Sequence, residues 1–259
     1  MGGADLLDTN VVFDLIYPDR PRYDRALQFY KNFKNLELSI ETKVHTECEK
    51  VTIEFISKFI TDLENFLASR NRRGKLWDGL NAKGRSEALN DFLSAHSNND
   101  KSRAKDILPF YTYAMKIIRS YLVHLSYTEI KEYLLSLSSE LLGYLHQQIL
   151  ARFSIITPYY AIDKEEITKL SENLRESILG KSFPSSQKDD FNILVSLIQI
   201  YSFGNSENEK YDSLSFYTND DDFFESYNKL QKSPPPLDEK LLNDYLKEAL
   251  NSITFHKPY

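Results

Sequence analysis

Residues 214–223 read LSFYTNDDDF, a short apolar run that ends in polar and acidic residues. A run of this length with turn-forming residues after it predicts a buried β-strand over 214–217. The N-terminal stretch has the same order: the apolar segment Ala4 to Leu7 ends in Asp8-Thr9-Asn10, and apolar residues resume at Val11. Both stretches therefore predict a strand with an aspartate just beyond its carboxyl end.

The segments around these two strands alternate between helical and strand-like patterns. Such alternation is typical of an α/β fold with a parallel sheet. We expect helices near residues 23–33, 44–59, 164–179, 191–201 and 238–251, and further strands near residues 36–40, 153–157 and 253–256.

Residues 61–150 break this alternation. They show helical patterns only, separated by turns rich in Asn, Gly and Ser. We therefore predict one α/β domain formed by residues 1–60 and 151–259, interrupted by an all-helical insertion at 61–150.

The composition of the chain excludes several classes of protein. The 259 residues suffice for a sizeable core, and a hydrophobic content of 41% is ordinary for a globular protein. The single cysteine, Cys48, excludes an internal disulfide and fits a reducing compartment, so we expect a cytoplasmic protein. We expect no membrane association, because no apolar run is long enough to span a bilayer and no signal peptide is visible. The net charge of −6 argues against a protein that coats nucleic acid through bulk positive charge.

The two strand-end aspartates have two interpretations. In an open parallel sheet, ligands bind beyond the carboxyl ends of the strands, where Asp8 and Asp220 are expected. Aspartate is also a favoured N-cap, and helix-like sequence follows both residues. The sequence alone leaves both interpretations open.

Glu47 is a third candidate. In the helix predicted over 44–59 it lies roughly 60° from the apolar face that contains Val44, Cys48 and Val51, so it leans toward the sheet. A carboxylate at the margin of a buried face needs a cation or a hydrogen-bond donor nearby.

Asp190 is the fourth candidate, at the start of a strongly apolar helix. Residues 186–189 match a capping box, which accounts for Asp189. Asp190 lies on the same face as Ile193 and Leu194, which we expect to be buried. We therefore choose Asp190, and not Asp189, as the candidate ligand.

Four carboxylates in one crevice repel one another, and some would stay protonated at neutral pH unless a cation is bound. A ligand set made only of oxygen atoms suits Mg²⁺ or Mn²⁺, and such sites hydrolyse phosphodiester bonds. The five histidines show no metal-binding spacing, and no glycine-rich phosphate loop is present.

Together, the segments 6–10 and 217–223, with Glu47 and with Asp190 followed by Ile193, resemble the PIN-domain nucleases in content and order. The resemblance implies a three-layer α/β/α fold with a central parallel sheet, and an acidic Mg²⁺ or Mn²⁺ pocket that cleaves RNA, with DNA as the alternative. It implies catalytic, metal-binding roles for Asp8, Glu47, Asp190 and Asp220, and a supplementary metal-binding role for Asp222. Asn10 and Thr218 match polar residues of the motif that would orient these acids, although local turn capping explains them equally well.

We therefore expect a metal-dependent ribonuclease that acts as an endonuclease. Two alternatives stay open: a catalytically weak PIN-fold module that binds RNA or serves as a scaffold, and a toxin of a toxin–antitoxin pair. The resemblance also leaves open a homodimer and a protein partner such as an antitoxin. The long helical insertion departs from the compact pattern of PIN toxins.

The insertion contains a basic stretch. Residues 70–105 contain nine basic residues and four acidic ones. Such a patch can hold a phosphate backbone while Trp77 stacks on a base; the alternative is a set of solvated turns with Trp77 in the core. The candidate RNA-binding residues are Arg70, Arg72, Arg73, Lys75 and Arg85.

Overall fold

The computed structural model describes residues 2–33, 38–74, 76–97, 102–158, 164–181, 183–207, 209–237 and 240–259. The chain forms two compact units: unit 1 contains Met1–Phe13, Arg25–Cys48 and Leu150–Tyr259, and unit 2 contains Asp14–Asp24 and Glu49–Ile149. The division falls within helices α1 (Thr9–Ile16), α2 (Tyr23–Asn32) and α3 (Thr42–Arg72), and before the last residue of α6 (Tyr127–Leu150). The boundary that we expected after residue 60 lies inside α3, because its helical pattern continues without a break.

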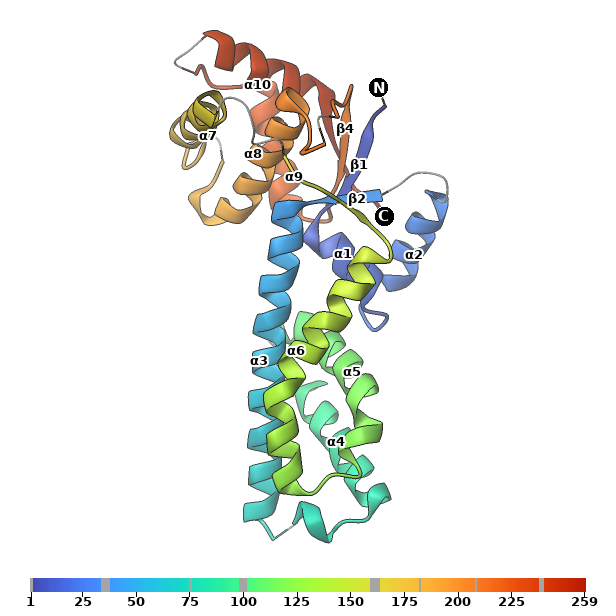
Figure 1. Cartoon of the computed structure of the whole chain (residues 1–259). Helices are drawn as coiled ribbons and strands as arrows, with labels where there is room; N and C mark the ends of the chain where they lie inside the picture. The colour runs from blue at the N-terminus through green and yellow to red at the C-terminus, as the bar shows by residue number, and fades with distance from the viewer. Residues whose placement is uncertain are drawn as a thin grey trace. The chain divides into compact units, whose positions relative to one another are not determined.

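Unit 1 is built around a five-stranded sheet in which every strand runs parallel to its neighbours (Figure 1). The order is β3-β2-β1-β4-β5, so that central β1 pairs with β2 on one side and β4 on the other. The predicted α/β fold with a parallel sheet is confirmed. The strands are β1 (Ala4–Leu7), β2 (Leu38–Glu41), β3 (Ser154–Ile156), β4 (Leu214–Tyr217) and β5 (Ile253–His256).

Helices cover both faces of this sheet, as the side chains of β4 show. Successive strand residues point to opposite faces. The Phe216 ring lies 5.7 Å from the ring of Phe223 in α9 (Asp221–Lys232). The next ring, Tyr217, lies 5.1 Å from Phe29 in α2 (Tyr23–Asn32), on the other face. The sheet is therefore the middle layer of unit 1.

Helix α8 (Lys188–Phe203) contacts β2, β5, α7 (Lys164–Ile178) and α10 (Lys240–Ser252). These neighbours explain its apolar sequence, since a helix that is packed on several sides is apolar on several sides. The predicted capping box at 186–189 is wrong. A 3₁₀ turn occupies Ser185–Gln187, and the N-cap of α8 is Gln187, which makes no capping hydrogen bond through its side chain.

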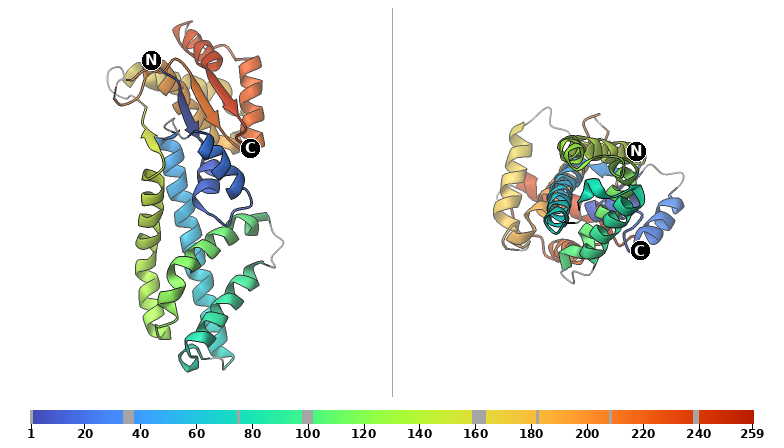
Figure 2. Two further views of the ribbon diagram at one scale, coloured as in Figure 1. Left: turned by 90° about the vertical axis from the view of Figure 1, so that its right-hand side faces the viewer. Right: turned by 90° about the horizontal axis from the view of Figure 1, so that it is seen from below.

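Unit 2 is helical over the residues described, and its helices gather in a bundle (Figure 2). Its elements are most of α3, the 3₁₀ turn Trp77–Gly79, α4 (Ala82–Ser97), α5 (Ser102–Leu122) and α6 (Tyr127–Leu150). The core is aromatic: the ring of Tyr111 lies 5.2 Å from that of Phe59 and 5.8 Å from that of Phe92. None of the helices in the described ranges is both long and apolar enough to cross a membrane.

The core around β4 allows a test of the fold. We expect Phe216→Ala to lower the free energy of unfolding by about 3–5 kcal/mol, because Phe216 is 0% exposed and its loss leaves a cavity beside Phe223 and Phe255. Leu135→Ala is the control; this side chain is 84% exposed, and its loss should change stability by less than about 0.5 kcal/mol. Chemical denaturation measures both values, and equal losses would contradict the core assignment.

Candidate active site

The register of the sheet places a row of polar residues along its carboxyl edge. Leu7 pairs with Tyr217, so the next residues, Asp8 and Thr218, lie side by side. On the other flank of β1, Leu6 pairs with Ser39, and the same register brings Glu41 level with Asp8. The strand order reverses at β1, and such a switch point is where ligands bind in open parallel sheets.

Asp8 is held by hydrogen bonds on both carboxylate oxygens. Its Oδ1 accepts from the backbone N–H of Thr9 at 2.8 Å, and its Oδ2 accepts from the hydroxyl of Thr218 at 2.6 Å. The side chain is 5% exposed. Burial raises the pKa of Asp8 to about 7, and the charges of Glu47 and Asp220 add to the rise against the lowering effect of the two hydrogen bonds.

Glu47 reaches the same cluster through Thr9. The Thr9 hydroxyl donates to Glu47 Oε2 at 2.5 Å, while the Thr9 backbone N–H donates to Asp8. One threonine at the start of α1 thus connects two of the predicted acids. Thr9 lies inside the Asp8-Thr9-Asn10 stretch, but nothing in that stretch indicated this connecting role.

Asp220 is the N-cap of α9, with its Oδ1 accepting from the Phe223 N–H at 3.0 Å. The cap interpretation therefore holds for Asp220, and its charge also acts on Asp8. Thr218 fixes the turn before it, since the Thr218 hydroxyl oxygen accepts from the Asp220 N–H at 2.9 Å. Asn10 contacts the same turn through its Oδ1, which accepts from the Asn219 N–H at 3.3 Å.

Asp190 joins the cluster from the first turn of α8 and is half-buried there. Burial, followed by the charges of Asp8, Asp220, Glu47 and Asp189, raises the pKa of Asp190 to about 8. The helical face chosen from the sequence thus brings Asp190 within electrostatic reach of the other three acids.

Four separate segments therefore deliver the predicted acids Asp8, Glu47, Asp190 and Asp220 to one region of unit 1. Asp222 is exposed in the first turn of α9 and is not among the main charges acting on Asp8 or Asp190. Within the described ranges, no three of the four acids have oxygen atoms all within 4.8 Å of one another, so an ion would have to draw the side chains closer. Oxygen donors and raised pKa values suit a divalent cation, whose charge would offset this repulsion.

Glu41 is a further buried carboxylate at this edge of the sheet, to which no role was given from the sequence. It is 0% exposed, and its carboxylate accepts from the Ser196 hydroxyl at 2.5 Å and from the Lys43 N–H at 2.6 Å. Burial raises the pKa of Glu41 to about 7. The rule that identified Asp8 would have identified it too, because Glu41 ends β2 at the same edge of the sheet.

The basic residues proposed to bind RNA, and Trp77 beside them, differ in their surroundings within unit 2. Trp77 is 1% exposed and its indole N–H donates to the Leu125 carbonyl at 2.9 Å, so the core interpretation holds for this residue. Arg85 donates to the carbonyls of Trp77, Val123 and Leu125, which stabilises the same turn.

Of the remaining basic residues, Arg70 pairs with Asp91 at 2.9 Å. Arg72 and Arg73 are exposed, and for them RNA binding stays a prediction. Lys75 lies outside the described residues.

Comparisons with protein-family models, with curated proteins and with solved structures give no match to this chain. We therefore argue function from the residues of the site.

The Thr218 hydroxyl offers a test of the site's geometry. We expect Thr218→Val to lower the free energy of unfolding at pH 8 by about 1–3 kcal/mol, because it removes a donor to Asp8 and an acceptor for the Asp220 N–H. Thr218→Ser keeps the hydroxyl and should lower the free energy of unfolding by less. Urea denaturation compares the two variants; a loss in the serine variant as large as in the valine variant would show that the hydroxyl contributes nothing.

Glu41 predicts a pH dependence of stability. Its pKa is about 7 in the folded protein and 4.5 ordinarily, so the folded state binds more protons between these values and loses stability as the pH rises through them. Glu41→Gln does not titrate. The free energy of unfolding of this variant, relative to wild type, should therefore rise by up to about 3 kcal/mol between pH 4.5 and pH 8. Denaturation curves across this range measure the difference, and a difference independent of pH would contradict the prediction.

Proposed function

We propose that the protein is a metal-dependent ribonuclease with a PIN-type fold in unit 1. The observation that carries the proposal is the convergence of Asp8, Glu47, Asp190 and Asp220 at the carboxyl edge of a parallel sheet, where the strand order reverses. A solely structural role accounts poorly for this arrangement, because burial and neighbouring negative charges raise the pKa values of Asp8 and Asp190, which costs folding free energy when the two are charged.

Each acid would act as an oxygen ligand of Mg²⁺ or Mn²⁺. A bound ion of this class supplies a water of lowered pKa and stabilises the charge that develops on the attacked phosphate. The protein's part is to hold the carboxylates: Thr9 connects Asp8 with Glu47, and Thr218 connects Asp8 with the turn of Asp220. Ligands that are fixed by hydrogen bonds keep their orientation while the substrate binds.

The turn at Asn219 supports a polar ligand at this edge. The Nδ2 of Asn219 is buried and has no hydrogen-bond partner among the described residues, while its backbone N–H donates to Asn10. A buried amide donor without a partner costs about 1–3 kcal/mol, and an oxygen atom of a bound phosphate or water would offset that cost. We propose RNA as the substrate and internal cleavage of the strand as the reaction.

The acids themselves provide the direct test. We expect Asp8→Asn and Asp220→Asn to reduce cleavage of a labelled RNA in Mn²⁺ roughly 100-fold or more, since each removes a charge from the site and keeps the shape. Both variants should also bind Mn²⁺ more weakly in isothermal titration calorimetry. Asparagine is itself a good N-cap, so Asp220→Asn should leave the start of α9 intact.

Asp221→Asn is the matched control. Asp221 is the next residue along, is exposed and pairs with Lys257, so its loss removes the same charge from outside the cluster. Cleavage and Mn²⁺ binding should survive in this variant. Wild-type protein that binds RNA but neither binds Mn²⁺ nor cleaves would overturn the proposal in favour of an RNA-binding module.

A further inference from the structure

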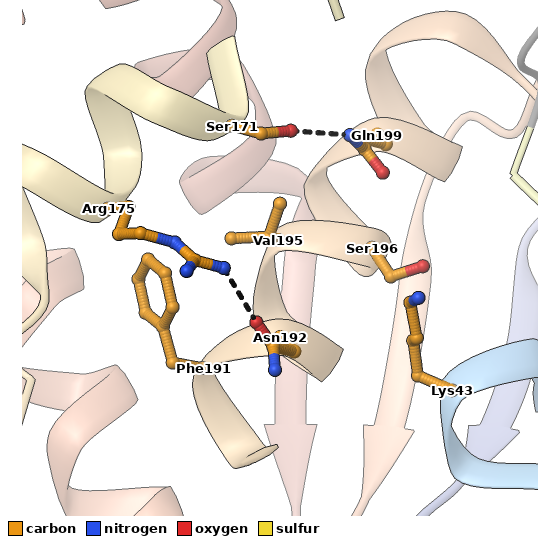
Figure 3. Close-up of a pocket in the computed structure, with 8 residues that line it drawn as sticks. All are labelled: Lys43, Ser171, Arg175, Phe191, Asn192, Val195, Ser196 and Gln199. Atoms are coloured by element: carbon orange, nitrogen blue, oxygen red, sulfur yellow. Dashed lines mark hydrogen bonds between the residues drawn. The ribbon is translucent and has the colours of Figure 1, made fainter. Parts of the chain in front are cut away.

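A polar pocket opens beside the acidic cluster in unit 1, between α7, α8 and the start of α3 (Figure 3). Its cavity measures about 350 Å³, near the lower end of the ~300–1,000 Å³ of small-molecule sites. The lining residues are Lys43, Ser171, Arg175, Phe191, Asn192, Val195, Ser196 and Gln199.

The charge of this pocket is positive. Lys43 and Arg175 line it and no acidic residue does, in a chain whose net charge is −6. Both cations are exposed, and Figure 3 shows them on different elements, Lys43 on α3 and Arg175 on α7. Arg175 has only one long hydrogen bond within the pocket, from its Nη2 to Asn192 Oδ1 at 3.5 Å. Its guanidinium can therefore turn toward an anion at little cost.

The inner wall of the pocket is polar and fixed. Ser196 is buried and donates its hydroxyl proton to Glu41, which leaves its oxygen as an acceptor. Gln199 is also buried, and its Nε2 donates to Ser171 Oγ at 2.8 Å. Hydroxyl and amide groups held in this way suit the sugar and base edges of a nucleotide, while the cations suit its phosphate.

Lys43 relates one edge of the pocket to the acids. Lys43 precedes Glu47 by four residues on α3, which places the two on one face about 6 Å apart along the helix axis. On α8, Asn192 follows Asp190 by two residues, so the pocket and the acid lie on different sides of that helix. The same two helices thus carry both the acids and the pocket.

We propose that this pocket binds a nucleotide of the RNA strand next to the cleaved bond, with its phosphate between Lys43 and Arg175. The inference rests on the proposed function, because that function makes RNA the ligand. It adds a subsite that positions the strand, since the acids alone repel a phosphate backbone in the absence of an ion.

Binding without cleavage tests this subsite. The probe is a short fluorescent single-stranded RNA in EDTA, with affinity measured by anisotropy at several salt concentrations. The double variant Lys43→Gln, Arg175→Gln should raise the Kd at least about tenfold and reduce the slope of log Kd against log salt by about 0.7, the value for one phosphate contact on a single strand. Because both side chains are exposed, the melting temperature should stay near that of wild type.

Lys169→Gln is the control. Lys169 lies on α7 as Arg175 does, but it pairs with Glu165 and does not line the pocket. Its loss removes a positive charge from the same helix and should change the Kd by less than about twofold.

A second measurement locates the phosphate. Replacing the phosphates of the probe one at a time by neutral methylphosphonates should weaken wild-type binding most at one linkage, and the double variant should be insensitive at that linkage. Equal sensitivity of both proteins at every linkage would overturn the subsite, as would an unchanged Kd in the double variant. Neither measurement involves metal or cleavage, so the subsite can fail while the nuclease proposal stands. Failure of the nuclease proposal is seen separately, in the cleavage and Mn²⁺-binding measurements.

Discussion

The parallel pairing of β1 with β4 is the constraint on which the site depends. Because Leu7 pairs with Tyr217, Asp8 must lie beside Thr218, and the 2.6 Å hydrogen bond between them follows from the register. A slip of one residue would turn every side chain to the other face of the sheet and separate the two. The hydrophobic burial that fixes the register therefore also fixes the position of a charged group in the core.

The charged forms of the buried acids are unfavourable in the folded protein, and a bound cation would stabilise them. Asp8, Asp190 and Glu41 all have raised pKa values because burial disfavours their charged forms. Hydrogen bonds from Ser196 and Lys43 offset part of the cost of burying Glu41, whereas Asp8 and Asp190 also repel each other. The chain thus separates a satisfied structural carboxylate from a cluster that a cation would stabilise.

Helix α8 borders two surfaces of opposite charge, the acidic cluster and the pocket that Lys43 and Arg175 line. Its first turn presents Asp190 to the acidic cluster, and the following residues border a pocket with two cations and no acid. Under the proposed function a polynucleotide would use both surfaces: the cations would attract its backbone, and the carboxylates would hold the ion at which the reaction takes place. Glu41 lies between the two surfaces. It ends β2 at the edge of the sheet where Asp8 lies, and its carboxylate accepts a hydrogen bond from Ser196, which lines the pocket.

The sequence by itself determined the strands that precede Asp8 and Asp220, the helical faces on which Glu47 and Asp190 lie, and the parallel α/β class. These follow from local periodicity, which depends on near neighbours along the chain. Only the tertiary structure decided that Glu41 lies level with Asp8, that Thr9 connects Asp8 with Glu47, and that Trp77 is core. The pocket around Lys43 and Arg175 was equally invisible, because its residues come from three helices. Such relations depend on strand register and helix packing, which no single segment encodes.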